Sequence, residues 1–341
     1  MAQKCDDARR VTIYDVAREA GVVASTVSRA FARPGRVNAA TAQRIRLAAQ
    51  LLGYRTNPMA RALPTGKTSI IALTISDVSN PFFTEIIRGA QAAAAEADFT
   101  MMLADGQESE LLEREALERS IPIAEGLILA SSRMSDAAIK MTAKQKPMVV
   151  LNRAIPEVPS LITDNLSGAR QVAGYLHRHG HRSITYVAGP EASWADGARW
   201  SALRTVAAEM HLTTKRIGPF PPNVQGGQLA AEKLAGEKLR GHPPTAVLAY
   251  NDQIAIGLIR TLIAAGLDVP GDVSVIGFDD IFASRLITPA LTTVAAPLRQ
   301  MGEMAVHNLL AVIKGAQPKA GQAFVLPTHL VERESAGPAR H

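Results

Sequence analysis

The sequence predicts an α/β protein with a small all-α head at its N-terminus and a larger body of two lobes, each built on a parallel β-sheet. Two observations support this fold class. Residues 12–53 carry the apolar spacing of short amphipathic helices, and from residue 69 onward strand-like and helix-like segments alternate. The chain has 341 residues and a hydrophobic content of 47%, which is ample for the buried core of such a body.

The positive charge of the chain is concentrated in its first fifth. The formal net charge is +6, yet residues 1–64 alone hold 11 Lys and Arg against 4 Asp and Glu, so the rest is close to neutral. A basic terminal segment on a near-neutral body suggests an acidic partner, with DNA as the leading candidate. A solubilising basic tail is the alternative, but such a tail would not carry helical patterning.

Composition excludes several other classes of protein. Cys5 is the only cysteine, which rules out disulfide frameworks and cysteine-rich zinc sites. No apolar run approaches the roughly 20 residues that a membrane-spanning helix needs. The N-terminal segment MAQKCDDARR is polar and lacks the apolar core of a secretory signal. We therefore expect a soluble, intracellular protein with no membrane partner.

Three short helices are predicted in the head. Thr12 followed by Asp15 resembles a capping box for the first helix, and Gly21 suits the left-handed residue that ends it. The second helix is expected at residues 24–31, and Asn38 starts the third. Two short helices separated by a tight turn form a helix-turn-helix, which places its second helix in the major groove of DNA. The expected apolar core consists of Val16, Ala17, Val27, Ala30, Phe31, Ile45, Ala48, Ala49 and Leu52.

The segment RTNPMARALP, residues 55–64, follows the head. Asn57 is a good N-cap and Pro58 suits the first position of a helix, but the segment stops at Pro64. One or two isolated helical turns do not persist in water, so this helix would form only against a partner surface such as DNA. An ordinary linker is the alternative that spacing alone favours.

From residue 69 onward, the sequence predicts two Rossmann-like lobes. Strand candidates are 69–75, 99–104, 126–130, 148–152, 183–188, 246–250 and 273–278, and helix candidates are 83–97, 167–179, 196–210, 226–239 and 253–265. This alternation is typical of parallel sheets covered by helices on both faces. Ligands of such folds sit in a crevice beyond the carboxyl ends of the strands, which here would be the cleft between the lobes.

Polar residues cluster at those strand ends. They are found in residues 76–83, 152–153, 189–200, 251–252 and 279–280. This set fits a small polyhydroxylated ligand, because Asp279 can accept hydrogen bonds from two adjacent hydroxyls and Arg199 can donate two parallel ones. Aromatic side chains could cover the apolar face of a sugar ring; the candidates are Phe82, Trp194 and Phe220. The alternative is that strand-end Asp and Asn side chains merely cap the helices that follow.

The strings VTIYDVAREAGV and STVSR, followed by NPMARAL and the two-lobed body, closely resemble the LacI/GalR family of bacterial transcription regulators over essentially the whole chain. The resemblance implies a periplasmic-binding-protein-like body. It also implies that Ala24, Ser25 and Arg29 read bases, and that Leu63 wedges into a base step from the minor groove. The DNA-binding residues so implied are Thr12, Tyr14, Ala24, Ser25, Thr26, Ser28, Arg29 and Arg36 in the head and Asn57, Ala60, Arg61 and Leu63 in the hinge.

The same resemblance places the effector site. Together with the strand-end clustering it gives nine candidate effector-binding residues: Asp77, Asn80, Phe82, Asn152, Trp194, Arg199, Phe220, Asn251 and Asp279. Asp252 is expected to be structural, as the N-cap of the next helix. The effector would be a sugar, a polyol or, less favoured, a nucleobase, and no metal or other cofactor is expected.

The implied organisation has three parts. Residues 1–55 form the DNA-binding head, 56–68 the hinge helix and linker, and 69–341 the effector-binding and dimerisation domain. Within the latter, the N-lobe would take residues 69–163 and 295–326, and the C-lobe 164–292. A homodimer would bind a palindromic operator, as a cytoplasmic repressor associated with the nucleoid when bound to DNA. Effector binding would switch the hinge helices between ordered and disordered states.

The head departs from the family pattern at three positions. Val23 stands where Ser usually caps the recognition helix, Ala32 replaces the usual Asn, and Pro64 follows the hinge leucine where a basic or polar residue is more usual. The missing cap costs roughly 1 kcal/mol. These departures indicate an operator preference of this chain's own.

Two other function classes compete with this interpretation. A sugar-binding transport protein would share the two-lobed body, and an enzyme could act on a sugar or nucleotide in the cleft. PTGKT at 64–68 ends like a phosphate-binding loop but has Arg61 where the pattern needs Gly. The histidines of HRHGHR, at 177, 179 and 181, could suggest a metal, but they suit the end of a helix. The C-terminal segment lacks leucine heptads, so no coiled-coil tetramer is expected.

Overall fold

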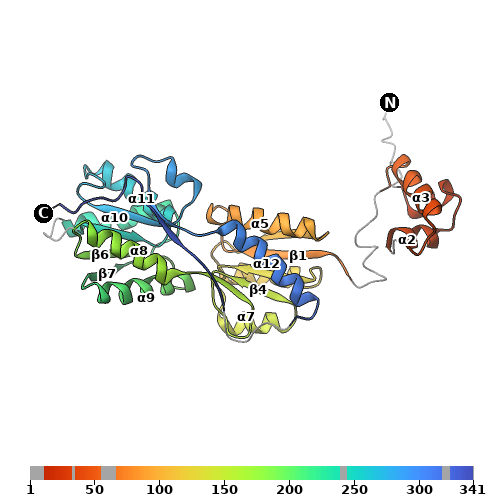
Figure 1. The fold of residues 1–341 in the computed structure, drawn as a ribbon, viewed down its shortest axis with the longest axis horizontal. Coiled ribbons are helices and arrows are strands. Elements are labelled where there is room, and N and C mark those ends of the chain that lie inside the picture. Colours follow the sequence, from red (N-terminus) through yellow and green to blue (C-terminus); the bar gives the residue numbers. More distant parts are fainter. Residues whose placement is uncertain (1–10, 33–34, 55–66, 239–243, 317–322, 341) are drawn as a thin grey trace, which may run out of the picture. The chain divides into compact units, whose positions relative to one another are not determined.

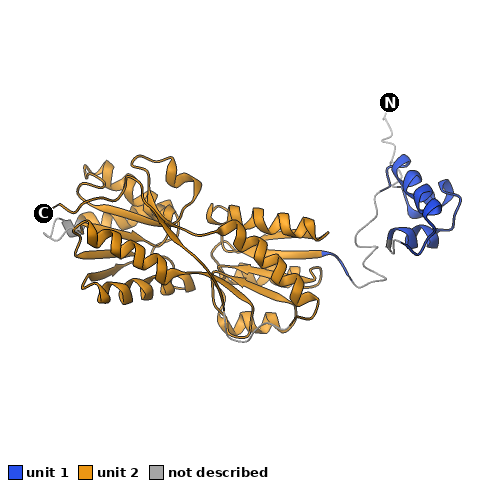
Figure 2. Ribbon diagram, in the orientation of Figure 1, with its two compact units in different colours: residues 1–69 blue, residues 70–341 orange. Residues whose placement is uncertain are grey.

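The computed structural model describes residues 11–32, 35–54, 67–238, 244–316 and 323–340. It divides into two compact units, residues 1–69 and residues 70–341 (Figure 2). The first unit contains the predicted head and the second the predicted body.

The head consists of three helices, α1 (Ile13–Glu19), α2 (Ala24–Ala32) and α3 (Ala39–Leu51). The backbone N and Oγ1 of Thr12 both donate to Oδ2 of Asp15, at 2.9 and 2.7 Å, so this pair fastens the start of α1. Gly21 follows α1 with φ +62°, the left-handed conformation of a helix C-cap. Asn38 accepts from the backbone of Thr41 at 3.1 Å and caps α3.

The core of the head joins all three helices. Val16 of α1, Val27 of α2 and Ile45 of α3 are fully buried, and Ala17, Ala20, Ala48 and Ala49 fill the space around them. Ala30, Phe31 and Leu52 pack against this cluster but are only partly buried. The small core leaves the opposite face of α2 to solvent.

The first lobe of the body is built on a six-stranded parallel sheet in the order β11-β5-β4-β3-β1-β2. Its strands are β1 (Ile70–Ile75), β2 (Thr100–Asp105), β3 (Gly126–Ala130), β4 (Met148–Leu151), β5 (Ser160–Thr163) and β11 (Phe324–Leu326). The associated helices are α5 (Phe82–Glu96), α6 (Glu110–Ser120), α7 (Asp136–Ala143) and α12 (Leu298–Ile313). Every pairing in this sheet is parallel, as the alternating pattern predicts.

The second lobe has its own six-stranded sheet, in the order β12-β10-β9-β8-β6-β7. Its strands are β6 (Ser183–Val187), β7 (Thr213–Ile217), β8 (Ala246–Ala249), β9 (Ser274–Asp279), β10 (Thr292–Ala295) and β12 (His329–Val331). Its helices are α8 (Asn165–Arg178), α9 (Trp194–Glu209), α10 (Val224–Lys238), α11 (Asp252–Ala264) and the short 3-10 helix η1 (Phe282–Arg285). Only the edge strand β12 runs antiparallel to its neighbour within these described strands.

The chain passes between the lobes at three places (Figure 1). It crosses after β5, returns after β10 to form α12 and β11, and crosses again into β12. Two details differ from the expected boundaries. Strand β10 carries the second lobe to residue 295 rather than 292, and the return of the chain with β12 was not expected at all.

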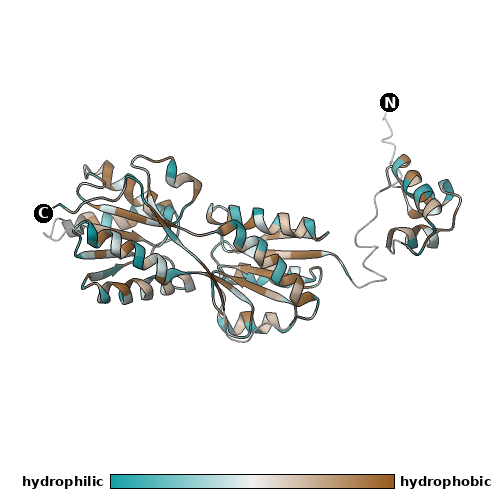
Figure 3. Ribbon diagram, viewed as in Figure 1, coloured by the Kyte–Doolittle hydropathy of each residue, from teal (hydrophilic) through white to brown (hydrophobic). Residues whose placement is uncertain are grey.

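The central strands carry the core of the body. Strands β3, β4, β8 and β9 are buried along their whole length, which explains their continuous apolar runs (Figure 3). The edge strand β7, TTKRI, is largely exposed. Among the described residues, no helix is both long and apolar enough to cross a membrane.

Candidate functional site

A cavity with an empty volume of about 280 Å³ lies between the carboxyl ends of the two sheets. Ser76, Ser131 and Asn152 follow β1, β3 and β4 of the first lobe, while Tyr250 follows β8 and Asp279 ends β9 of the second. The complete lining comprises Ser76, Asn80, Phe82, Phe83, Ser131, Arg133, Asn152, Arg199, Pro222, Tyr250, Asn251 and Asp279. Polar groups from both lobes therefore line the cavity. It lies beyond the carboxyl ends of the strands, where folds of this kind bind their ligands.

Arg199 and Asp279 form a buried ion pair in this cavity. Nη2 of Arg199 lies 3.0 Å from Oδ1 of Asp279, and the side chains are 4% and 5% exposed. Nη1 donates to the carbonyl of Tyr250, and the guanidinium carbon lies 3.6 Å from the centre of the Phe278 ring. The buried Nε has no partner among the described residues. A ligand oxygen could accept this remaining hydrogen bond.

Asp279 is electrostatically unusual. Burial raises the pKa of its carboxyl group to about 6, although the Arg199 guanidinium and its hydrogen bond pull the pKa down. Its backbone has φ +119°, a conformation that residues other than Gly rarely adopt. Strain of this kind clusters at functional sites because the surrounding structure imposes it.

Two asparagines contribute differently to the cavity. Nδ2 of Asn152 donates to Oγ of Ser131 at 3.1 Å, while its buried Oδ1 has no partner among the described residues and is available to a ligand donor. Oδ1 of Asn251 accepts from the backbone of Ile254 at 2.9 Å, and its Nδ2 donates to the carbonyl of Pro222. Asn251 is thus the N-cap of α11, and it keeps one N–H for the cavity.

That arrangement corrects the expectation for Asp252. The N-cap of α11 is Asn251, whereas Asp252 is fully buried and joins segments that are distant in sequence. Its carboxylate accepts from the backbone of Ile281 at 2.9 Å and from Oγ1 of Thr293 at 2.5 Å. Burial and the nearby charge of Asp279 raise the pKa of Asp252 well above its ordinary value. Asp252 is structural, as expected, but its role is not that of a helix cap.

Of the nine candidate effector residues, the structure brings six together: Asn80, Phe82, Asn152, Arg199, Asn251 and Asp279. Three lie outside the cavity lining. Asp77 accepts from the backbone and hydroxyl of Ser79 and shapes a turn. Trp194 is the half-buried first residue of α9, and Phe220 packs against the core of the body. The ligand contacts of all nine remain a prediction.

The sequence reasoning missed six lining residues: Ser76, Phe83, Ser131, Arg133, Pro222 and Tyr250. A signal existed for four of them. Ser76 and Phe83 belong to the segment 76–83 that follows the first predicted strand, and Ser131 and Arg133 follow the predicted strand 126–130 just as Asn152 follows its own. Phe83 is adjacent to the candidate Phe82 and meets it edge to face, with ring centres 5.0 Å apart. Tyr250 was predicted as the last residue of the strand 246–250, and nothing in the sequence indicated that it lines the cavity.

The head exposes one polar face of α2. Ser25, Ser28 and Arg29 are exposed at i, i+3 and i+4, opposite the buried Val27. Tyr14 is 70% exposed and Arg36 is exposed, whereas Thr12, Ala24 and Thr26 are half-buried. This side-chain arrangement matches a helix that presents its surface to a partner.

Val23 stands at the start of α2, where its carbonyl accepts from the backbone of Thr26 at 2.8 Å. Its side chain is 66% exposed and offers no oxygen to cap the helix. Six further side chains lie outside the described part of the structure: those of the hinge candidates Asn57, Ala60, Arg61 and Leu63, and those of the departures Ala32 and Pro64.

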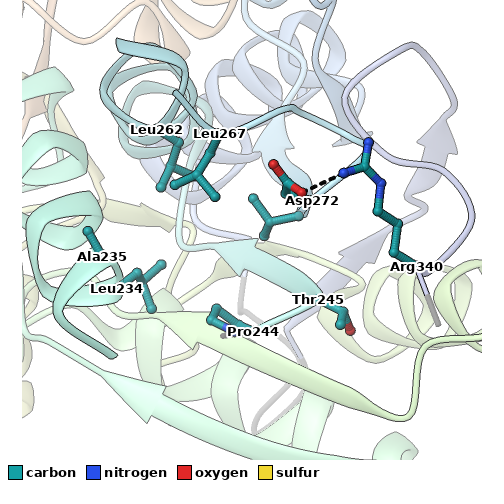
Figure 4. A pocket seen from close by; sticks show the side chains of 9 residues that line it. Leu234, Ala235, Pro244, Thr245, Leu262, Leu267, Asp272 and Arg340 are labelled. Carbon is teal, nitrogen blue, oxygen red and sulfur yellow. Dashed lines mark hydrogen bonds and ion pairs between the residues drawn. The ribbon is translucent and has the colours of Figure 1, made fainter. Parts of the chain in front are cut away.

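A larger, mainly apolar cavity of about 710 Å³ lies elsewhere in the second lobe (Figure 4). It opens at the amino ends of β8 and β9, between Leu234 of α10 and Leu262 of α11. Its charged lining residues, Asp272 and Arg340, form an ion pair with a 2.7 Å separation. Because ligands of such folds bind at the opposite ends of the strands, the smaller polar cavity is the candidate effector site.

The histidines near the end of α8 have separate partners. Nδ1 of His179 lies 2.9 Å from the carbonyl of Tyr175, whereas the buried His181 contacts Thr245 and the carbonyl of Gly337. Burial lowers the pKa of His181. Within the described residues, no group of three His, Cys, Asp or Glu side chains could hold a metal ion.

Comparisons with known proteins connect the two units to one family. Residues 12–57 match the model for bacterial regulatory proteins of the lacI family, and residues 173–336 match the periplasmic binding protein-like domain. The HTH-type transcriptional repressor CytR of Escherichia coli (strain K12) is 33% identical over 322 residues, which cover 92% of this chain and 93% of the relative. The HTH-type transcriptional regulator GalR of the same strain is 34% identical over 330 residues, with 95% of each chain covered.

Solved structures extend the similarity to three dimensions. The lac repressor dimer bound to operator and the anti-inducer ONPF matches with a TM-score of 0.86 at 26% identity, covering 96% of this chain and all of that one. A LacI family transcriptional regulator from Enterococcus faecalis with bound ribose matches with a TM-score of 0.69 at 27% identity, over 80% of this chain and all of the other. These relatives are regulators rather than enzymes or transport proteins. The chain therefore belongs to the lacI family of bacterial transcriptional regulators, with a helix-turn-helix head and a ligand-binding body.

Proposed function

We propose that this protein is a cytoplasmic repressor that binds a palindromic operator as a homodimer and responds to a small polyhydroxylated ligand in the cavity of its body. The observation that carries the DNA-binding half is the exposed face of Ser25, Ser28 and Arg29 on α2, within the basic part of the chain. Arg29 offers a planar fork of donors that suits guanine, and phosphate contacts would come from the surrounding cations and hydroxyls.

The polar lining of the cavity supports a small hydroxylated ligand. The space between the lining atoms, about 280 Å³ including space open to solvent, is below the usual range for ligand pockets, so a sugar ring would require the two lobes to move apart. Arg199 and Asn152 each keep a buried polar atom without a partner among the described residues, one a donor and one an acceptor. A hydroxyl can satisfy both kinds of atom, and leaving them unpaired costs free energy. Phe82 and Phe83 also line the cavity, although both are almost wholly buried in the core. The ribose-bound relative makes a sugar the leading ligand class.

The proposed switch acts through lobe closure. A ligand that contacts Asn152 and Asp279 together favours one arrangement of the two lobes, because these residues belong to different lobes. Residues 57–63 would then order or disorder as a hinge helix, and the coupling free energy should be about 1–3 kcal/mol. Sequence alone favours a plain linker here, so the hinge rests on the family pattern.

The DNA-binding half is tested with Arg29→Ala. An operator is first selected from random palindromes, and dissociation constants are then measured for this operator and for unrelated DNA. We expect the variant to lose about 10- to 100-fold of affinity for the operator and much less for unrelated DNA, because one bidentate base contact contributes about 1–3 kcal/mol of discrimination. Arg44→Ala, at an exposed arginine of α3, is the matched control. Equal losses on both DNAs would exclude base reading by Arg29.

The ligand half is tested by a thermal-unfolding screen of monosaccharides, polyols and nucleosides against the full chain. Only a ligand that binds the folded state raises the midpoint in a saturable way. We expect a hit that stabilises the wild type, changes its operator affinity and loses both effects in Asp279→Ala. A hit that acts unchanged on Asp279→Ala would place the effector site elsewhere.

A further inference from the structure

Arg133 is the second guanidinium group of the cavity, and a carboxylate already occupies it. Its Nε lies 2.7 Å from Oε2 of Glu108, and its Nη2 lies 3.0 Å from Oε1. Nη1 donates to the carbonyl of Ser131 at 3.0 Å. The Arg133 side chain is 5% exposed and that of Glu108 is 23% exposed. This two-pronged contact is the geometry with which arginine also binds the carboxylate or phosphate of a ligand.

The backbone holds Glu108 in place. Gln107 and Glu108 have φ +48° and +57°, two successive left-handed conformations that L-residues rarely adopt. The amide of Glu108 donates to the carbonyl of Ser76 at 2.5 Å, and the amide of Gln107 donates to Oδ1 of Asp105 at 3.1 Å. Because the loop is tied to the end of β1, Glu108 meets Arg133 in a fixed position rather than as a mobile surface side chain.

Arg133 is also fixed from the other side. Its backbone amide donates to Oε2 of the buried Glu113 at 2.8 Å, and burial raises the pKa of Glu113. Burial opposes the charge of the Arg133 guanidinium, but interactions with Tyr250 and Glu108 raise its pKa overall. Arg133 therefore remains a cation at the cavity wall whose carboxylate partner is Glu108.

The charge balance of the cavity follows from these contacts. Each of its two guanidinium groups has one carboxylate, Glu108 for Arg133 and Asp279 for Arg199. An anionic ligand would have to displace Glu108, or leave a carboxylate without its cation in a poorly solvated place. A neutral hydroxyl needs no displacement, since arginine has five N–H donors and the contacts of Arg133 with Glu108, Ser131 and Tyr250 use four.

We propose that Glu108 determines the specificity of the cavity for an uncharged ligand, by occupying the part of Arg133 that would bind a carboxylate or phosphate. The proposal rests on the cavity being the effector site. It assigns sugars and polyols to the ligand class and excludes sugar acids and sugar phosphates. Replacing Glu108 by a neutral residue converts Arg133 into an anion-binding group.

The test uses acetate as a small carboxylate probe and requires no effector and no DNA. Thermal unfolding midpoints of the full chain are measured in sodium acetate and in sodium chloride at equal ionic strength. We expect the same wild-type midpoint in both salts. Glu108→Gln should have a lower midpoint in chloride and regain several degrees in acetate, in a saturable manner. If Glu108→Gln is unfolded in chloride, acetate should restore its fold.

Two controls assign the effect to Arg133. Glu110 lies two residues from Glu108 and forms a more exposed ion pair with Arg114. Glu110→Gln removes this carboxylate and should gain no acetate response. The double variant Glu108→Gln/Arg133→Gln should also lack the response, because the cation is gone. The proposal is overturned if acetate stabilises the wild type as strongly as Glu108→Gln, or if Glu108→Gln gains nothing from acetate. Since no sugar or operator is used, these outcomes are separate from the tests of the proposed function.

Discussion

Asp279 combines three features that an ordinary aspartate lacks: near-complete burial of its side chain at the cavity wall, an ion pair with Arg199, and a positive φ. The ion pair fixes one carboxylate oxygen, Oδ1. The other oxygen has to serve any ligand hydroxyl that binds here, and it accepts well only when the group is ionised. The protonation of this one residue therefore controls the recognition chemistry of the proposed site.

Effector affinity should fall as the pH drops below about 6. Burial raises the pKa of Asp279 to about 6 in the folded protein, from an ordinary value of 3.8. The proton therefore stabilises the fold at low pH, and this contribution is lost as the pH rises through about 6. Ligand binding has the opposite sign, because protonation removes an acceptor. Ligand titrations from about pH 5 to 8 should show a roughly one-proton decline in affinity at the acid end.

Asp279→Asn provides the comparison for this pH dependence. The amide cannot titrate, so the variant should bind weakly and with little change in affinity across the same pH interval. Asp252 also has a raised pKa and lies close to Asp279, but its oxygens are engaged by Ile281 and Thr293. An acid decline that survives in Asp279→Asn would assign the titration to Asp252 or another group.

Two adjacent residues with similar capping ability show what the sequence cannot predict at the level of single residues. Asn251 and Asp252 are both good helix caps, and nothing local decides which one caps α11. The decision comes from Thr293 and Ile281, which are far away in the sequence and take the carboxylate of Asp252. Glu108 was missed for a similar reason, because its partner Arg133 lies 25 positions further along the chain.

At the scale of elements, the sequence predicted seven of the strands, most of them buried along nearly their whole length. Strands β1, β3, β4, β8 and β9 read as short apolar runs because helices or neighbouring strands cover them. The sequence analysis missed the buried four-residue strands β5 and β10, the edge strand β7, TTKRI, and the three-residue strands β11 and β12. Their hydrogen bonds come from a distant partner, and so few residues carry no periodicity of their own.

The contact between α10 and α11 depends on two glycines that a sequence pattern does not single out. A Cβ on Gly257 would lie 2.0 Å from the carbonyl oxygen of Val224, and one on Gly227 would lie 2.1 Å from that of Ile254. Both obstacles are backbone atoms that cannot turn away as a side chain does. The two helices approach each other this closely only because neither position has a side chain.

Gly257→Ala should therefore lower the free energy of unfolding by about 2 kcal/mol or more, because the helices must move apart and lose packing. The matched control is Gly197→Ala in α9, where an added Cβ would meet no described atom within 4 Å. That substitution should be neutral or stabilising by up to about 1 kcal/mol, since alanine favours the helix. Urea denaturation of both variants measures the difference, and equal effects would contradict the packing argument.

At the scale of the whole molecule, the sequence predicts two lobes in the body but not the number of times that the chain passes between them. The alternation of strands and helices indicates a sheet for each half, whereas the late crossings after β10 and β11 depend on short strands. Six of the nine effector candidates meet in one cavity because parallel strands share a carboxyl edge. The three others follow strands as well, but their side chains serve a turn, a helix start and the core.

A homodimer requires a surface of its own, and η1 offers the apolar part of one. Phe282 is the first residue of η1 and Leu286 directly follows its last residue. Their side chains are 75% and 66% exposed, among the largest exposures of apolar side chains in the described structure. Exposed apolar residues this near to each other in the chain are candidates for contact with a protein partner, and the lac repressor to which this chain is similar is described as a dimer. We therefore expect a second copy of this chain to cover them.

Phe282→Glu/Leu286→Glu should shift the protein from dimer to monomer, because two carboxylates would be desolvated in each copy of the interface. Sedimentation equilibrium measures the dissociation constant of the dimer, and circular dichroism verifies that the variant is folded. The monomer should also lose far more affinity for a palindromic operator than for a single half-site. In a dimer, binding of the first head raises the effective concentration of the second head at the other half-site. Met141→Glu on α7, 58% exposed in the wild type, adds a charge elsewhere and should leave the dimer intact. An unchanged dissociation constant in the double variant would show that η1 lies outside the dimer interface.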